Sequence, residues 1–476
     1  TDILRNEWHF KGHVVSDCFA LRDFYQHHMV TKDAVESAAL AMNNGCDLNC
    51  GHMYLHLSEA VSRGKVSESR LRAAVTNLLK LGMEQDKELP DNPYDKIPYS
   101  VVDSVEMREF NESVSEKTFV LLKNNGILPL NREKLRTIAV IGPNADSRRA
   151  LVGNYEGTAS RYITISEGIQ DYVGDSVRVL VSEGCDLYKE NWKKNRIAEV
   201  REMAEMSDVV ILCLGLDAGI EGEQGDAGND FASGDKPDLK LPGEQNQILE
   251  AALDSGKPVV VLLLSGSALA VNTAQERAAA VMQCWYPGAQ GGRAVARILF
   301  GEVSPQGHLP VTFYKSTEEL PEFTDYSMKN RTYRYMEQEA LYPFGFGLTY
   351  GNVKVSAAEF AEQPEKEKPV KIRCTVTNTG KWDTEEVVQV YIKDWKSKYA
   401  VRNHSLCGFR RVRVKAGESI ETELTIDPRA FTIVDEEGKR YVDSNKFSLY
   451  VATTQPDARS TALTGHEAVE LRVVFA

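Results

Sequence analysis

Cysteine is scarce in this chain, and excess positive charge and long apolar runs are absent from it. Eight cysteines in 476 residues are too few for a disulfide-rich scaffold. The net charge of −13 argues against a surface that follows phosphates, so nucleic acid is not expected as a partner. No run reaches the roughly 18 apolar residues that a membrane span needs. A membrane partner is therefore not expected either.

Metal-ligand spacings are also lacking. Cys46-Asp-Leu-Asn-Cys50 has no second cysteine pair that would complete a zinc site, and His27-His28 is better explained as a surface pair. The composition, 42% hydrophobic and 26% charged, is that of an ordinary globular protein. The length predicts two or three domains.

Residues 1–88 alternate short strands with helices. Strands are predicted at His13–Val15 and Cys46–Asn49, and helices at Leu4–Trp8, Asp33–Asn43 (with Thr31 as its cap), Met53–Arg63 (ended by Gly64) and Glu68–Met83. This amounts to about two βα units, whereas a (β/α)8 barrel needs eight units and about 250 residues. If the region belongs to a barrel, we expect most of that barrel to be missing upstream.

Asp17 follows the first of these strands. In α/β proteins the carboxyl ends of the strands are where the chemistry is done. The plain alternative is that Asp17 caps the next turn.

A second alternating region begins near residue 110. Continuous apolar strands are predicted at Thr137–Ile141, Val177–Val181, Val209–Leu214, Val259–Leu264 and Ala280–Cys284, with helices at Arg196–Met206, Glu244–Leu253 and Gly292–Phe300. Such runs favour a largely parallel sheet that is covered on both faces.

From residue 351 onward the pattern changes to short alternating strands. They are predicted at Lys371–Thr377, Glu386–Tyr391, Ser419–Ile426, Lys446–Ala452 and Glu470–Phe475, separated by turn residues. This pattern is typical of a β-sandwich, and nothing in it indicates catalysis.

An acidic, glycine-rich loop follows the predicted strand at Val209–Leu214. It runs Leu216-Asp-Ala-Gly-Ile-Glu221-Gly-Glu223-Gln-Gly-Asp226-Ala-Gly-Asn-Asp-Phe. A solvated acidic loop is the plain explanation. Loops this long are uncommon unless they are functional or disordered, and the glycines allow the backbone to fold tightly towards a ligand.

Several segments, taken together and in order, resemble glycoside hydrolase family 3. Trp8-His-Phe-Lys-Gly-His-Val-Val-Ser-Asp17 is similar to the segment that carries the family's nucleophile. Phe119-Val-Leu-Leu-Lys-Asn-Asn-Gly-Ile-Leu-Pro-Leu130, Trp285-Tyr-Pro-Gly-Ala-Gln-Gly-Gly, Gly307-His-Leu-Pro-Val-Thr-Phe313 and Tyr342-Pro-Phe-Gly-Phe-Gly-Leu-Thr-Tyr350 resemble later family segments.

The resemblance implies a multidomain fold of α/β and β parts. Residues 1–88 would be the C-terminal portion of a (β/α)8 barrel, 110–325 an α/β sandwich domain and 351–476 a fibronectin type III-like domain, with linkers at 89–109 and 326–350.

The resemblance also implies two catalytic carboxylates. Asp17 aligns with the nucleophile, and the acid/base is expected in the second domain, where a Glu precedes an Asp by three positions. Glu223 and Asp226 have that spacing, and Glu221 is the fallback. A retaining mechanism needs such a pair, with the two carboxyls about 5–5.5 Å apart. The two carboxylates suffice, so no metal or organic cofactor is expected.

Cys18 and Cys50 bear on the choice of sugar. Glucose-specific members of the family usually have Trp after the nucleophile, whereas Cys18 and Asp47-Leu-Asn-Cys50-Gly look like the β-xylosidase branch, as does Gly153-Asn-Tyr-Glu-Gly157. If the strands before them are neighbours, about 4.8 Å apart, the two thiols are within reach of a disulfide. We expect this pair beside the pocket for a hexose hydroxymethyl group, which would favour a pentose. Two reduced core cysteines are the alternative.

The implied function is that of an exo-acting retaining glycosidase acting on terminal β-D-xylosyl residues of oligosaccharides, with β-D-glucosyl or α-L-arabinosyl residues as alternatives. No segment matches the family's sugar-clamping Lys-His, Arg and Asp positions, so the chain by itself is expected to be inactive or severely impaired. A non-catalytic carbohydrate-binding or scaffolding fragment is therefore a competing hypothesis, and an N-acetylglucosaminidase a weaker one. The assembly state is open, with a homodimer among the expectations, and so is the compartment: cytoplasm, periplasm or secretion.

Overall fold

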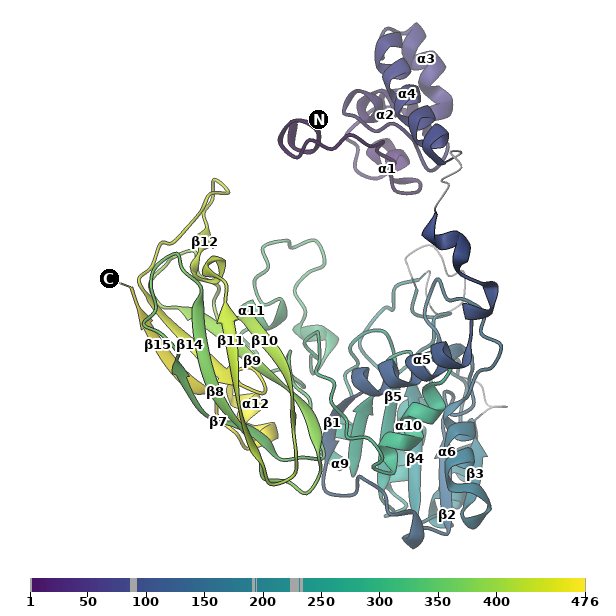
Figure 1. Ribbon diagram of the computed structural model, residues 1–476. Coiled ribbons are helices and arrows are strands. Elements are labelled where there is room, and N and C mark those ends of the chain that lie inside the picture. Colours follow the sequence, from purple (N-terminus) through teal and green to yellow (C-terminus); the bar gives the residue numbers. More distant parts are fainter. Residues whose placement is uncertain are drawn as a thin grey trace. The chain divides into compact units, whose positions relative to one another are not determined.

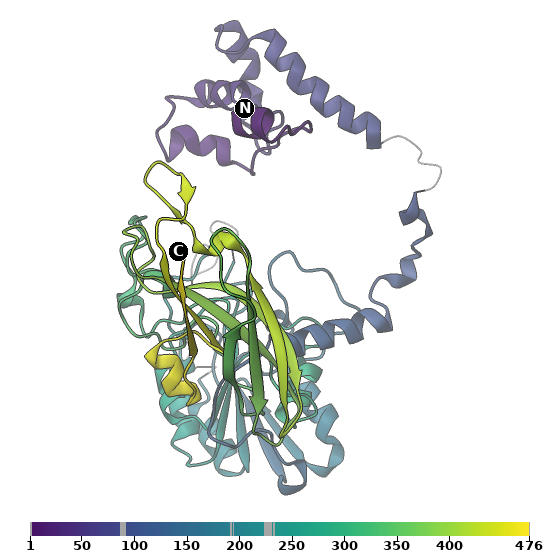
Figure 2. The ribbon, with the colours of Figure 1, turned by 60° about the vertical axis from the view of Figure 1, so that its left-hand side comes forward.

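The fold is known from a computed structural model, which describes residues 2–85, 92–190, 193, 195–222, 231 and 234–475 (Figures 1 and 2). The chain divides into two compact units, residues 1–99 and 100–476. Each unit is described by itself.

The first unit is mostly helical. Its elements are the π-helix η1 (Asp2–Glu7), α1 (Ala20–Gln26), α2 (Ala34–Asn43), the 3-10 helix η2 (Met53–His56), α3 (Leu57–Ser62) and α4 (Glu68–Gln85). Small apolar residues on α2 pack with residues of α3 and α4, among them Ala38, Met42, Ala60 and Ala74. Helices α2, α3 and α4 lie where helices were predicted, and small side chains on their facing sides let them approach closely. The helix expected at Leu4–Trp8 is the π-helix η1 at Asp2–Glu7, and α1 was not predicted.

The predicted cap of α2 is wrong. The side chain of Asp33, not that of Thr31, accepts a hydrogen bond from the backbone N–H of Glu36, at 2.8 Å. The Thr31 hydroxyl instead pairs with the Ser37 hydroxyl at 2.6 Å. Asp is among the residues preferred at this position, and it directly precedes the first helical residue.

Short turns lead into the second unit. The 3-10 helices η3 (Pro93–Lys96) and η4 (Tyr99–Val101) precede α5 (Val105–Thr118), which Ser104 caps through a 3.3 Å bond from the Met107 N–H. The segment expected as a linker at 89–109 thus contains the beginning of α5.

A six-stranded sheet forms the centre of the second unit. Its strands are β1 (Val120–Asn124), β2 (Thr137–Ile141), β3 (Arg178–Ser182), β4 (Val209–Gly215), β5 (Val259–Leu264) and β6 (Ala280–Gln283), in the order β1-β6-β5-β4-β2-β3. All neighbours run parallel except β1, which pairs antiparallel with β6 at one edge. The prediction of a largely parallel sheet is confirmed; the edge strand β1 was not predicted.

Helices cover both faces of this sheet. On one face lie α5, α6 (Ile165–Val173) and α10 (Gly291–Leu299), and on the other α7 (Ile197–Glu205), α8 (Gln245–Leu253) and α9 (Asn272–Arg277) (Figure 1). Alternate side chains of each strand are buried under the helices of opposite faces, so the central strands are apolar along their whole length. Helices α6 and α10 approach at Gly168 and Gly292, where a Cβ on Gly168 would lie 2.2 Å from the Gly292 backbone.

The C-terminal part, here called the two-sheet region (residues 351–475), contains two antiparallel sheets around one core. One sheet has the order β10-β9-β14-β15 and the other β11-β8-β7 (Figures 1 and 2). The elements are β7 (Val353–Phe360), β8 (Val370–Asn378), β9 (Thr384–Asp394), β10 (Ser405–Val414), β11 (Ser419–Ile426), β12 (Ile433–Val434), β13 (Arg440–Tyr441), β14 (Lys446–Ala452), α12 (Ala458–Thr464) and β15 (Val469–Val474). All five predicted strands are present; β7 and β10 were not predicted.

The remaining short helices lie in connections: η5 (Arg132–Lys134), η6 (Arg149–Leu151), η7 (Gly174–Ser176), η8 (Thr317–Glu319), α11 (Thr332–Tyr335) and η9 (Pro428–Phe431). The segment expected as a linker at 326–350 contributes Tyr342 and Phe346 to the core of the six-stranded sheet. Among the described residues, no helix is both long and apolar enough to pass through a bilayer.

Candidate active site

Parallel pairing in the first unit places Asp17. Val15 bridges Leu48, the Ser16 N–H donates to the Leu48 carbonyl at 2.9 Å, and the Leu48 N–H donates to the Val14 carbonyl at 3.0 Å. The two short segments therefore run side by side as predicted, although each pairs over too few residues to count as a full strand. Asp17 follows one segment and Asn49 the other, so both lie at the same end of the pair.

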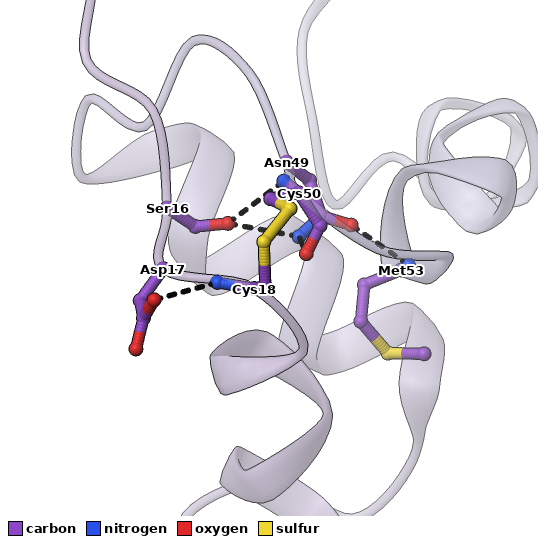
Figure 3. Close-up of a disulfide and its surroundings, with 6 residues drawn as sticks. All are labelled: Ser16, Asp17, Cys18, Asn49, Cys50 and Met53. Atoms are coloured by element: carbon purple, nitrogen blue, oxygen red, sulfur yellow. Dashed lines mark hydrogen bonds between the residues drawn. A yellow bond between two sulfur atoms is a disulfide. The ribbon is translucent and has the colours of Figure 1, made fainter. Parts of the chain in front are cut away.

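Ser16 ties these two ends together. Its hydroxyl oxygen accepts hydrogen bonds from the Asn49 side-chain amide at 2.9 Å and from the Cys50 backbone N–H at 3.1 Å (Figure 3). Asn49 in turn accepts a 2.9 Å bond from the Met53 N–H, which fixes the start of η2. The backbone on both sides of Asp17 is thereby held without using its carboxylate.

A disulfide joins Cys18 to Cys50, with Cα atoms 4.4 Å apart. The predicted bond between these cysteines is confirmed, and the alternative of two reduced core cysteines is wrong. Asp17 precedes the bond directly and is exposed; one of its oxygens accepts a 2.8 Å hydrogen bond from the Cys18 N–H. In Figure 3 the Asp17 carboxylate points away from Asn49 and Cys50. An accessible carboxylate thus lies beside a covalent crosslink.

Asp47 anchors this region, and sequence reasoning missed its role. Its side chain is fully buried and accepts charge-assisted bonds from Arg5 and Arg70, each at 3.0 Å. The Val14 N–H and the Asn77 amide donate to it as well, at 3.1 and 3.3 Å. The position of this carboxylate between two predicted strand residues, Cys46 and Leu48, could have indicated that it is buried. Its partners Arg5 and Arg70 lie 42 and 23 residues away in the sequence, so the sequence did not identify them.

In the second unit, the acidic loop begins where β4 ends. Gly215 has φ +134°, and a Cβ there would lie 2.0 Å from the Leu264 carbonyl oxygen, so the chain can turn only at a glycine. The buried side chain of Gln245 holds both backbone groups of Gly215, each at 2.8 Å. Next, the Asp217 carboxylate accepts a 2.7 Å bond from the Gly219 N–H.

Glu221 is held by three donors. Its carboxylate accepts bonds from the Gly266 N–H at 2.6 Å, from the Tyr286 hydroxyl at 2.5 Å and from the Ser267 hydroxyl. Burial, followed by the charge of Glu221, raises the pKa of Tyr286 far above its usual value, so this phenol remains a donor. These three bonds fix the Glu221 carboxylate against the turn at Gly266–Ser267 and against Tyr286.

Described residues on the two sides of the acidic loop are hydrogen-bonded to each other, and one of them is also bonded to the segment after β5. The Gly222 N–H donates to the Gly234 carbonyl at 3.0 Å, and the Lys236 ammonium donates to the Ala268 carbonyl. Burial lowers the pKa of Lys236 to about 8. Glu223 and Asp226, the expected acid/base pair, lie outside the described residues.

Three family models match the chain, in order along the sequence. The glycosyl hydrolase family 3 N terminal domain matches residues 1–81, the glycosyl hydrolase family 3 C-terminal domain residues 119–350, and a fibronectin type III-like domain residues 386–455. The matches extend over both units of the chain.

Three similar proteins match over nearly all of the chain. A xylan 1,4-β-xylosidase of Xylanibacter ruminicola is 28% identical, with 97% of this chain and 70% of that protein covered. A β-xylosidase of Formosa agariphila is 30% identical, covering 97% and 66%. The solved structure of a β-glucosidase from Erythrobacter marinus has a TM-score of 0.84 at 29% identity, covering 100% and 65%. The chain spans between 65% and 70% of the length of these three proteins.

Substituting Asp47 tests whether its buried charge holds the first unit together. In Asp47→Asn, Arg5 and Arg70 lose their counter-charge, which should lower the local free energy of unfolding by about 3 kcal/mol. Amide hydrogen exchange of peptides from residues 2–85 should then be about a hundredfold faster. Asp23→Asn, which alters a half-exposed carboxylate, should change stability by less than about 0.5 kcal/mol. Unchanged exchange in Asp47→Asn would contradict this role.

Proposed function

Because the chain belongs to glycosyl hydrolase family 3, we propose that it acts as a retaining exo-glycosidase on terminal, non-reducing β-D-xylosyl residues of oligosaccharides. The observation that carries the proposal is the exposed carboxylate of Asp17, at the end of the Val15–Leu48 pairing and beside the Cys18–Cys50 disulfide. The names of the similar proteins from Xylanibacter ruminicola and Formosa agariphila support xylose as the sugar.

The proposed reaction uses two carboxylates in two steps. Asp17 attacks the anomeric carbon and forms a glycosyl ester, while Glu223 gives its proton to the departing glycosidic oxygen. Glu223 then takes a proton from water, the water oxygen attacks the same carbon, and the sugar leaves with the Asp17 carboxylate regenerated. Net retention of configuration follows from the two displacements. The mechanism uses no metal and no organic cofactor.

The fold assignment that goes with this function is part of the proposal. Residues 1–88 would be the C-terminal portion of a (β/α)8 barrel, 110–325 an α/β sandwich domain and 351–476 a fibronectin type III-like domain. Two successive extended segments, each followed by a helix and joined to each other by a parallel bridge, support the barrel assignment for the first of these. Further barrel strands would have to come from outside the described residues.

The Cys18–Cys50 disulfide is the proposed determinant of pentose preference. It stands directly after Asp17, where a bulky crosslink would occupy the space that a hexose hydroxymethyl group needs. Rejection of one such group by shape alone is worth roughly 10–200-fold in kcat/KM, so a preference rather than an absolute selectivity is expected.

A β-glucosidase is the second candidate. It is favoured by the 29% identity and TM-score of 0.84 to the Erythrobacter marinus enzyme, and by a periplasmic β-glucosidase of Salmonella typhimurium that is 29% identical. The two candidates share the carboxylate chemistry and differ in the sugar, so the catalytic experiment below applies to both.

Trapping the covalent intermediate tests the nucleophile. Incubating the protein, at its natural length, with a 2-fluoro xyloside should leave one glycosyl ester, on the peptide that contains Asp17, as found by mass spectrometry. Asp17→Asn should not be labelled and should lower kcat at least about a thousandfold. Asp23→Asn, which changes a half-exposed carboxylate of α1, should be labelled normally. A label on any other carboxylate would refute the assignment.

Exchanging the cysteine tests the sugar preference. Cys18→Trp removes the disulfide, and the ratio of kcat/KM for aryl xyloside over aryl glucoside should fall at least about tenfold. Cys46→Ser alters a free cysteine of the same unit and should leave the ratio unchanged. An unaltered ratio in Cys18→Trp would exclude the disulfide as the determinant.

Loosening Glu221 tests whether the residues beside the acidic loop position the acid/base. Tyr286→Phe removes one of the three donors, so xylosides with poor leaving groups, which need protonation, should lose about tenfold or more in kcat/KM. Dinitrophenyl xyloside, whose leaving group needs no proton, should keep its rate within about twofold. Tyr326→Phe, at an exposed tyrosine, is the matched control. Equal losses on both substrates would indicate a general structural defect instead.

A further inference from the structure

A cavity of about 430 Å³ lies on the two-sheet region and the chain before it. It is bounded by residues 333–340, by the chain between β9 and β10, by β14 and by the residues that lead into α12. This volume is within the range of small-ligand sites. None of the residues assigned to hydrolysis lines the cavity. A ligand of this cavity would therefore bind apart from those residues.

Aromatic surface is fixed in this cavity. Trp395 is 53% exposed, and its indole N–H donates to the Ser448 hydroxyl at 2.8 Å. That hydroxyl donates onward to Glu470 at 2.6 Å, so the ring is held by its polar edge. Tyr450, from the neighbouring strand β14, also lines the cavity. An exposed indole held in one orientation offers a flat apolar surface at little cost in conformational entropy.

The charges around the cavity balance. Three carboxylates line it and three cations do so too: Glu337, Glu339 and Asp457, and Lys393, Arg402 and Arg459. Burial lowers the pKa of His404, so this ring adds no charge at neutral pH. A strongly anionic or cationic ligand would therefore gain little from this site.

Most of these charged groups already have partners. Arg459 donates to the Leu341 carbonyl at 3.2 Å, Lys393 to the Val401 carbonyl at 3.1 Å, and Asp457 caps α12. Glu337 and Arg402 form a 3.0 Å ion pair and remain 42% and 57% exposed. Their free lone pairs and N–H groups lie next to each other, which suits hydroxyl groups, since each hydroxyl both donates and accepts.

We propose that this cavity binds a neutral sugar unit of an oligosaccharide, with the Trp395 ring against the apolar face of the sugar and the Glu337–Arg402 pair on its hydroxyls. The binding does not depend on hydrolysis. A second sugar site of this kind would hold a polymer near the enzyme while single residues are removed elsewhere. Small substrates such as aryl xylosides would not sense it.

Fluorine NMR of the full chain carrying fluorotryptophan tests the site directly. The probe is a thio-linked xylotetraose, which a glycosidase does not cut, with an oligogalacturonide of equal length as the anionic comparison. The Trp395 signal, identified by its loss in Trp395→Phe, should shift with xylotetraose with a Kd in the millimolar range, about −4 kcal/mol. The oligogalacturonide should have little effect.

Arg402→Gln keeps Trp395 as the reporter and should weaken binding at least about threefold, since it removes the ion pair. Trp382→Phe changes an exposed tryptophan that does not line the cavity and should leave the affinity unchanged. No shift of the Trp395 signal up to about 10 mM xylotetraose, or a shift by the anionic oligomer alone, would overturn the proposal. The signal reports on this cavity whether or not Asp17 proves to be the nucleophile.

Discussion

Backbone pairing between residues 14–16 and 47–48 is the interaction on which the rest of the first unit depends. It sets Asp17 and Asn49 at one end of two parallel segments, and the Ser16 hydroxyl and the Cys18–Cys50 bond then join those ends. The pairing is short, so it needs support from side chains. Asp47 provides that support by binding Arg5 and Arg70 from the two flanking parts of the unit. A covalent bond and a buried charge network therefore replace what a longer strand pair would supply.

In the second unit, a buried sheet and side-chain hydrogen bonds hold the residues beside the acidic loop. Its sheet is buried on both faces, and the buried apolar strands fix the point at which β4 gives way to the acidic loop. Beyond that point three donors hold Glu221, and further bonds tie Gly222 and Lys236. Rigid elements thus carry a polar loop, the usual arrangement by which a stable scaffold presents chemistry.

The residues proposed for hydrolysis and those proposed for sugar binding differ in what surrounds them. The exposed Asp17 carboxylate, proposed for hydrolysis, accepts a backbone N–H, whereas Trp395, proposed for sugar binding, follows β9 and lies among balanced charges. Carboxylates serve bond cleavage, and an aromatic face with paired charges serves recognition of a neutral ligand. The two proposals therefore concern two kinds of polar site on different parts of the fold.

The sequence by itself determined the strands β2, β4 and β5 and the helices α2, α3 and α4, because continuous apolar runs and helical spacing report local burial directly; it missed α1, and the predicted strand before Asp17 is a short bridged segment. The expectation that Cys18 and Cys50 pair came from the family resemblance together with the expected neighbouring strands. Only the tertiary structure decided that Asp33 rather than Thr31 caps α2, that β1 joins the sheet antiparallel, and which donors hold Asp47 and Glu221. Those partners lie tens of residues away, and periodicity along a chain carries no information about which distant side chain completes a buried polar group.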